Sequence, residues 1–177
     1  MPFLLIKITW GKWFTDEPWL PSGELQAAAL FDLRFRNSML SVWKIEDNQS
    51  NVDRVVTALA ATNNKRDIEN LDYVLFEMQS VLNLGIKMEQ HPGATPDVVA
   101  NNEWHHDLTE LTASKIVAIA HLIRRDGQFK RLQGFEVKDL LLQALNQGHI
   151  ALERLPDNLK PTLQRLAQGG FASQPDH

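Results

Sequence analysis

Apolar residues recur at helical spacing in three stretches of the chain. The first stripe follows Asn51, a good N-cap residue, and runs from Val52 to Ala60 at i, i+3, i+4, i+7 and i+8. Similar stripes predict one helix from Thr112 to Ile123 and another around Val137 to Leu145, which ends at Gly148. We expect the inward positions to share one core; they are Val55, Leu59, Ile116, Ile119, Leu141 and Leu145.

Shorter segments with strand-forming residues predict a small sheet. Phe3 to Thr9 and Ile86 to Gln90 are typical of strands. A hairpin is expected where residues 33–35 and 40–45 flank the turn residues Asn37 and Ser38. Between the first strand and this hairpin, Ser22 precedes good helix formers, which predicts a short helix over residues 24–30.

Residues 70–84 fit two structures. Their spacing favours a helix that ends at Gly85, but Tyr73 to Phe76 also fits a buried strand, because periodicity cannot separate the two over so few residues. Residues 91–97 contain two prolines and a glycine and predict a loop, and residues 151–168 predict a final short helix or pair of helices.

Together these elements predict an α+β fold. It has a small N-terminal, mostly antiparallel sheet with packed amphipathic helices, and a helix-rich C-terminal half. A chain of 177 residues without a long linker fits one domain, which we expect over residues 1–170, with a flexible C-terminal tail over 171–177.

The amino-acid composition of the chain excludes several classes of function. There is no cysteine, so disulfides, cysteine zinc sites and thiol catalysis are excluded. The N-terminus, Met1 to Lys7, lacks the pattern of a signal peptide, and no apolar run is long enough to cross a bilayer. We therefore expect a cytoplasmic protein that does not interact with membranes.

The segment from Glu103 to Glu110 contains the densest set of reactive side chains. Imidazole and carboxylate groups bind zinc or manganese, so His105, His106 and Asp107 are candidate metal ligands, with His91, Glu103 or His121 completing the shell. A metal-dependent hydrolase is the function that this interpretation implies. The interpretation that we favour is structural: Asp107 caps a helix in a capping box with Glu110, and the protein has no cofactor.

Tryptophan is concentrated in the connector between residues 10 and 21. Trp10, Trp13 and Trp19 could form a surface for a protein partner, because tryptophan is enriched in interfaces. The alternative is that they close the core at the end of the first strand. If they bind a partner, at least one of them should be exposed.

A basic segment lies between Arg124 and Lys138, with Phe129 and Phe135 interleaved. Basic and aromatic side chains together can hold nucleic acid. The net charge of −4 argues against it, because phosphate binding needs a positive surface. Nucleic-acid binding is therefore the second alternative function.

The common catalytic motifs are missing from the sequence. It has no GxGxxG, GxxxxGK[ST], GxSxG or HExxH pattern. We therefore expect a protein that is not an enzyme and that acts by binding, as a small component or accessory subunit of an assembly. Its partner is expected to be another protein or a second copy of itself.

Overall fold

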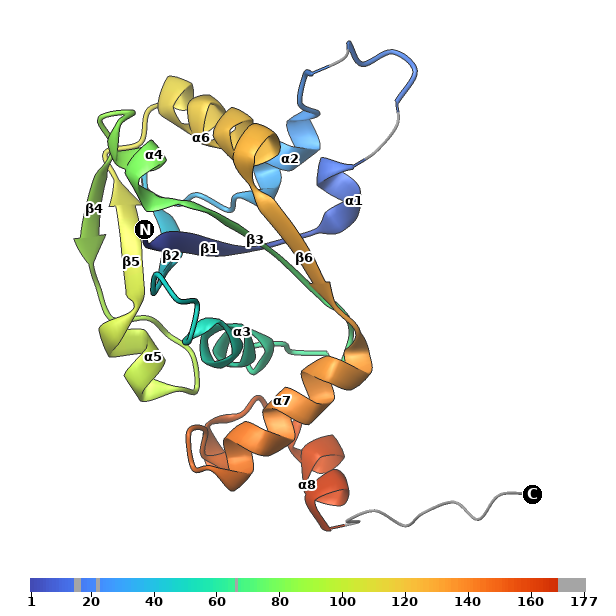
Figure 1. Cartoon of the computed structure of the whole chain (residues 1–177). Helices are drawn as coiled ribbons and strands as arrows, with labels where there is room; N and C mark the ends of the chain where they lie inside the picture. Colours follow the sequence, from blue (N-terminus) through green and yellow to red (C-terminus); the bar gives the residue numbers. More distant parts are fainter. Residues whose placement is uncertain (15–16, 22, 66, 169–177) are drawn as a thin grey trace.

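The computed structural model describes residues 1–14, 17–21, 23–65 and 67–168, and its centre is a six-stranded sheet between two layers of helices (Figure 1). The strands lie in the order β4-β5-β2-β1-β3-β6, and every neighbouring pair is antiparallel. They are β1 (Phe3–Ile8), β2 (Leu40–Ile45), β3 (Leu71–Glu77), β4 (Lys87–Gln90), β5 (His105–Thr109) and β6 (Gln128–Leu132). The predicted α+β class is confirmed.

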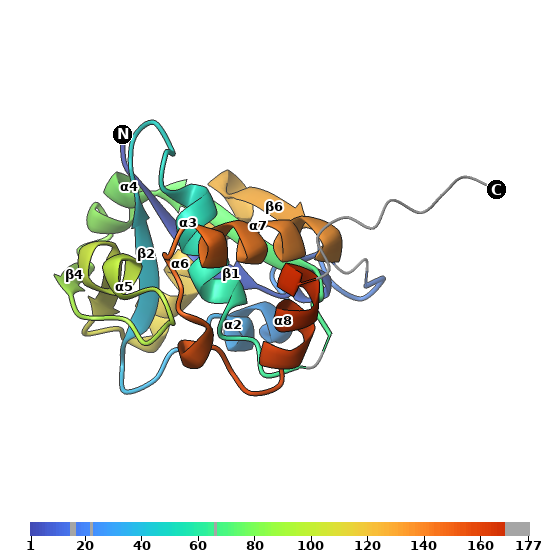
Figure 2. The same cartoon turned by 90° about the horizontal axis from the view of Figure 1, so that it is seen from below.

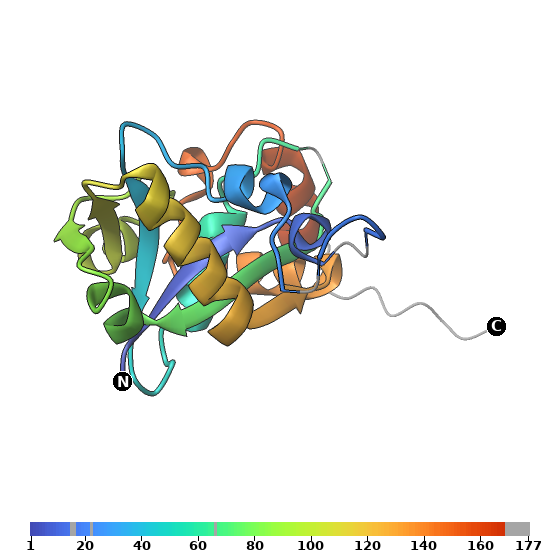
Figure 3. The same cartoon turned by 90° about the horizontal axis from the view of Figure 1, so that it is seen from above.

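The helices cover both faces of the sheet. Seen from below in Figure 2, one face carries α3 (Val52–Ala60), α5 (Val98–Glu103), α7 (Gly134–Asn146), α8 (Lys160–Gln168) and the 3-10 turn η1 (Leu152–Arg154). Seen from above in Figure 3, the other carries α1 (Trp10–Trp13), α2 (Ala27–Asp32), α4 (Met78–Leu82) and α6 (Ala113–Asp126). The helices predicted after Asn51, Thr112 and near Val137 are confirmed, as is the pair of short helices at the end.

The sheet divides the apolar interior into two cores. Successive residues of a strand point to opposite faces, so Leu4 and Leu5 of β1 enter different cores. Val55 and Leu141 are buried on the α3 and α7 side, where Leu59 and Leu145 are partly buried, while Ile116 and Ile119 are buried on the α6 side. The prediction of a single core was wrong, because helical stripes do not reveal which face of a sheet they cover.

Residues 71–77 form a strand, so the strand alternative for Tyr73 to Phe76 is confirmed and the long helix is wrong. β3 pairs with β1 on one side and β6 on the other, and residues 73–76 are all buried. A strand that is covered on both faces has a continuous run of apolar residues in its sequence. Such a run lacks the alternation of apolar and polar residues that would distinguish a strand from a helix.

The predicted hairpin is present only as its turn. Asn37 and Ser38 have φ values of 51° and 60°, and Arg36 and Met39 exchange backbone hydrogen bonds across them. Residues 33–35 are not a strand, because α2 continues to Asp32; β2 pairs with β1 and β5 instead. The helix predicted over residues 24–30 begins at Ala27, and its expected cap, Ser22, lies outside the described residues.

The C-terminal half contributes strands as well as helices. β5 and β6 both belong to the central sheet, so the separation into an N-terminal sheet and a helical second half holds only in part. The predicted tail, residues 171–177, lies outside the described residues. The extent of the predicted single domain stays a prediction.

Replacing Leu141 with alanine should lower the free energy of unfolding by about 2 to 5 kcal/mol, the usual cost of removing a buried leucine and leaving a cavity. Leu141 is only 1% exposed, in the core between α3 and α7. Urea denaturation measures the change. The matched control is Leu84→Ala, since Leu84 is 39% exposed and should change stability little. Equal effects of the two substitutions would contradict the assignment of this core.

Candidate functional site

The histidine segment lies in the sheet, which corrects the predicted helix entry. Asp107 does not cap a helix: it lies in β5, Glu110 has a φ of +55°, and α6 is capped by Thr112, whose hydroxyl accepts a hydrogen bond from the Lys115 N–H. The capping-box prediction was therefore wrong. Residues 105–109 gain their backbone hydrogen bonds from β2 and β4, which are distant in sequence and outweigh the local capping preference.

His105 and His106 point to opposite faces of the sheet, as adjacent strand residues must. His105 contacts the ring of Trp43, and its Nδ1 lies 2.8 Å from the carbonyl oxygen of His91. His106 has its Nδ1 3.1 Å from the carbonyl oxygen of Trp104, and burial lowers its pKa. The two imidazoles and Asp107 are thus not brought together around a common point.

Asp107 instead lies close to His91, which the sequence suggested as one of the additional metal ligands. Its carboxylate accepts a hydrogen bond from the Ser41 hydroxyl at 2.9 Å and lies 2.9 Å from His91 Nδ1. The other ring nitrogen of His91 is 3.9 Å from a carboxylate oxygen of Glu89. Over the described ranges, no three His, Asp or Glu side chains are grouped so that they could hold a metal ion.

The tryptophan connector and the basic segment meet at one end of the sheet. The rings of Trp10 and Phe129 both pack against Phe14, with centroids 4.6 Å and 4.5 Å away; Trp10 is tilted and Phe129 is edge-on. The guanidinium of Arg124 lies over Phe14 and that of Arg131 over Trp10, at 4.9 Å and 5.2 Å. Two candidate sites that are separate in sequence are therefore one cluster in space.

Much of this cluster is already engaged within the protein. Arg131 makes a two-point contact with Asp72, and Arg125 pairs with its neighbour Asp126. Burial raises the pKa of Asp72, but Arg131 and the Trp10 N–H lower it more, so the net pKa lies below the ordinary value.

The three tryptophans of the connector differ in exposure. Trp13 is buried and donates its indole N–H to Asp32, and Trp10 is half-buried in the aromatic cluster. Trp19 is 69% exposed, which confirms that at least one of the three is accessible. Whether it binds a partner stays a prediction.

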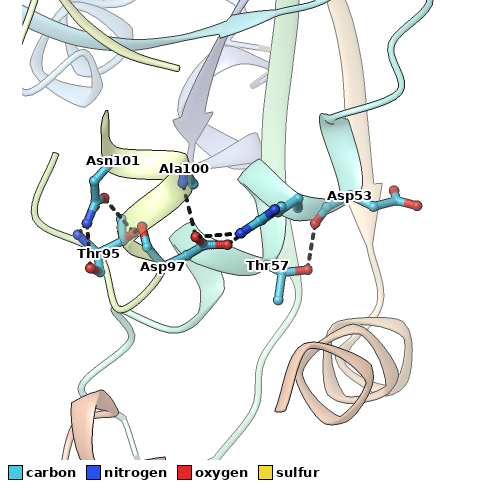
Figure 4. A network of polar contacts seen from close by, with 7 residues as sticks. Asp53, Thr57, Thr95, Asp97, Ala100 and Asn101 are labelled. Carbon is cyan, nitrogen blue, oxygen red and sulfur yellow. Dashed lines mark hydrogen bonds and ion pairs between the residues drawn. The ribbon is translucent and has the colours of Figure 1, made fainter. Parts of the chain in front are cut away.

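A polar network beside β5 joins α3 to α5 (Figure 4). Asp97 caps α5 by accepting a hydrogen bond from the Ala100 N–H, and it also accepts two from the guanidinium of Arg54, at 2.7 Å and 3.1 Å. The Asn101 amide exchanges hydrogen bonds with the backbone and hydroxyl of Thr95. These groups satisfy one another's hydrogen-bonding capacity, so the network holds α5 and the preceding loop in place.

An open apolar groove of about 570 Å³ lies between α2 and α6. Three large apolar side chains of its wall are accessible: Phe31 is 74%, Phe35 41% and Val117 39% exposed. The rest of the lining is Ala27, Leu30, Asn37, Ser38, Leu111, Ala113 and Ile116. This site was not predicted from the sequence, because Phe35 was assigned to a strand of the expected hairpin and Phe31 was not considered. The available signal was the apolar run from Ala27 to Phe31.

The segments that supply the walls of the groove carry more positive than negative charge. These segments, residues 27–38 and 111–117, contain Arg34, Arg36 and Lys115. Their one acidic residue, Asp32, is buried and already accepts four hydrogen bonds, from Thr9, Lys12 and Trp13. The lining itself is apolar except for Asn37 and Ser38, and the excess of cations belongs to the segments that carry it.

Comparison with protein-family models, with curated proteins and with solved structures finds no match to this chain. Across the part of the chain that the structure describes, every helix is too short or too polar to traverse a bilayer.

Proposed function

We propose that this protein acts by binding, as an accessory component of a cytoplasmic assembly, and that the groove between α2 and α6 receives a helix of a protein partner. The observation that supports the proposal is the gathering of Phe31, Phe35 and Val117 around one open groove. Exposed apolar side chains are ordinary when scattered, but a contiguous set around a concavity is typical of an interaction site.

The chemistry proposed for the partner follows from the groove and from the charge of the segments that carry it. A groove of this kind suits an amphipathic helix that places large apolar residues at i, i+3 or i+4, and i+7 on the floor. Arg36 and Lys115, which belong to the segments that supply the walls, favour Asp and Glu beside that apolar stripe, since complementary charge speeds association and excludes wrong partners. The proposed occupant is therefore an acidic amphipathic helix.

The alternative functions have less support. The metal-dependent hydrolase requires one of His105 and His106 to converge with Asp107, His91 or His121. Among the described residues, no three His, Asp or Glu side chains are grouped so that they could hold a metal ion. Nucleic-acid binding requires available cations, whereas Arg125 and Arg131 are paired with Asp126 and Asp72.

Replacing Phe31 with serine should weaken binding of an acidic amphipathic peptide about 10- to 30-fold, the effect of removing one central apolar anchor. The probe is a synthetic fluorescein-labelled helix with leucines on one stripe and glutamates beside it, measured by fluorescence anisotropy. Val117→Ser should act in the same direction. Stability should change little, because Phe31 is largely exposed.

The matched control is Phe135→Ser. Phe135 is 68% exposed but lies on α7, in the helix layer on the other face of the sheet. The proposal fails if Phe135→Ser weakens binding as much as Phe31→Ser does, or if a peptide with lysine in place of glutamate binds equally well. A dimer in light scattering that Phe31→Ser dissociates would also overturn it, because the occupant would then be a second copy of the chain.

A further inference from the structure

Lys7 is the one charged residue of β1 and lies on the sheet face opposite the groove between α2 and α6. It pairs with Tyr73 of β3 and points to the same side as Leu5, under α3 and α7. The side chain is half-buried, and no residue in the described ranges forms a hydrogen bond or ion pair with its ammonium group. A lysine in such a place normally has a carboxylate partner, because an unpaired buried charge is costly.

Lys7 lines a small cavity of about 20 Å³ together with Asn63, Glu69 and Asn70. Each of the two asparagines uses its carbonyl oxygen elsewhere: Asn63 accepts from the Lys65 N–H, and Asn70 from the Gly134 N–H. Their NH₂ groups have no partner among the described residues. The cavity therefore presents three sets of N–H donors, from one ammonium and two amides.

The charges around the cavity are mainly positive. Burial lowers the pKa of Lys7, and the nearby charges of Arg34 and Lys65 lower it further, while Glu69 opposes them. Glu69 is already bonded to Lys65, so it does not neutralise Lys7 fully. A negatively charged group in the cavity would relieve this repulsion and accept the unused hydrogen bonds.

We propose that Lys7, Asn63 and Asn70 form a binding site for one oxyanion group, a phosphate or a carboxylate, of a small-molecule ligand. A volume of about 20 Å³ holds one water-sized oxygen, so one oxygen of the ligand enters the cavity and the remainder stays at its mouth. Apart from Glu69, which is paired with Lys65, the rest of the lining is apolar and strengthens the charge-assisted hydrogen bonds inside; it consists of Ala60, Ile68, Leu71, Val137, Leu141 and Leu159.

The test is an NMR titration of the whole protein with inorganic phosphate and, separately, with acetate at constant ionic strength. Saturable shifts of the Asn63 and Asn70 side-chain amide signals are expected with at least one of them, and the ion that saturates identifies the oxyanion. Lys7→Met should weaken binding about 10- to 100-fold, the effect of one charge-assisted hydrogen bond. The control Lys130→Met, in the edge strand β6, should bind as the unmodified protein does.

A second variant keeps the test decisive if Lys7→Met does not fold. Asn70→Asp retains the oxygen that accepts from Gly134 but replaces the free NH₂ with negative charge, so it should abolish binding. Binding should also weaken as pH rises through the lowered pKa of Lys7, because the neutral amine loses its charge. Shifts that grow linearly with both salts, or saturable shifts that are unchanged in Asn70→Asp, would overturn the site.

Discussion

Replacing Asp97 with alanine should lower the free energy of unfolding by about 3 to 5 kcal/mol, the usual cost of removing one partner of a buried ion pair. The Asp97 side chain is 1% exposed and accepts hydrogen bonds from Arg54 and from the Ala100 N–H. Alanine would leave the Arg54 guanidinium without its carboxylate and α5 without its N-cap. Guanidinium denaturation followed by circular dichroism measures the loss.

The pH dependence of stability provides the control for this pair. Burial raises the pKa of Asp97, but Arg54 and the backbone N–H groups of α5 lower it more, so its pKa in the folded protein lies below the ordinary value. A depressed carboxyl pKa adds stability that is present above about pH 4 and is lost as pH falls through the folded pKa. Asp97→Asn should be less stable at neutral pH and lose less on acidification; parallel pH profiles of the two proteins would contradict the assignment.

Replacing Asp32 with alanine should destabilise the protein by a similar amount, about 3 to 5 kcal/mol. Asp32 is 1% exposed and accepts four hydrogen bonds: from the backbone and hydroxyl of Thr9, at 2.6 Å and 2.8 Å, from the Trp13 indole at 2.9 Å and from the Lys12 ammonium at 3.2 Å. Thermal unfolding by calorimetry measures the loss.

The Asp32 substitution should also alter the groove. This carboxylate ties α1 to the C-terminal end of α2, and α2 supplies Ala27, Leu30 and Phe31 to the wall. Asp32→Ala should therefore weaken binding of the acidic amphipathic peptide as well as stability, whereas Leu141→Ala should weaken stability alone. Unchanged peptide affinity in a folded Asp32→Ala protein would show that the hydrogen bonds of Asp32 do not position α2.

Local sequence determines the elements whose signals lie within one helix or one turn. The stripe from Val52 to Ala60 predicts α3, Gly148 marks the end of a helix, and Asn37-Ser38 predicts a tight turn. Each of these rests on side chains or backbone angles within a few residues of one another. The absence of cysteine and of common catalytic motifs is likewise a property of the sequence alone.

Sequence reasoning failed where the partners are distant along the chain. β5 takes its hydrogen bonds from β2 and β4. β6 follows α6 directly because Gly127 allows the turn between them. A Cβ atom at Gly127 would lie 2.3 Å from the carbonyl oxygen of Ile123. Neither strand is marked by a periodic pattern in the local sequence. Both strands were therefore missed, and the histidine pair was placed at a helix entry.

The sites depend on tertiary structure even more than the strands do. Trp10 to Phe14 and Arg124 to Arg131 are separate candidates in the sequence, and they form one cluster because β1, β3 and β6 are neighbours in the sheet. The groove between α2 and α6 likewise joins residues from Ala27 to Val117, and the Lys7 cavity joins residues from Lys7 to Leu159. The sequence by itself determined the helix faces, the turns and the classes of chemistry that are excluded, because these depend on composition and on neighbours along the chain. Only the tertiary structure decided which side chains meet. Strand order brings them together, and pairing in a sheet is set by contacts across the whole fold.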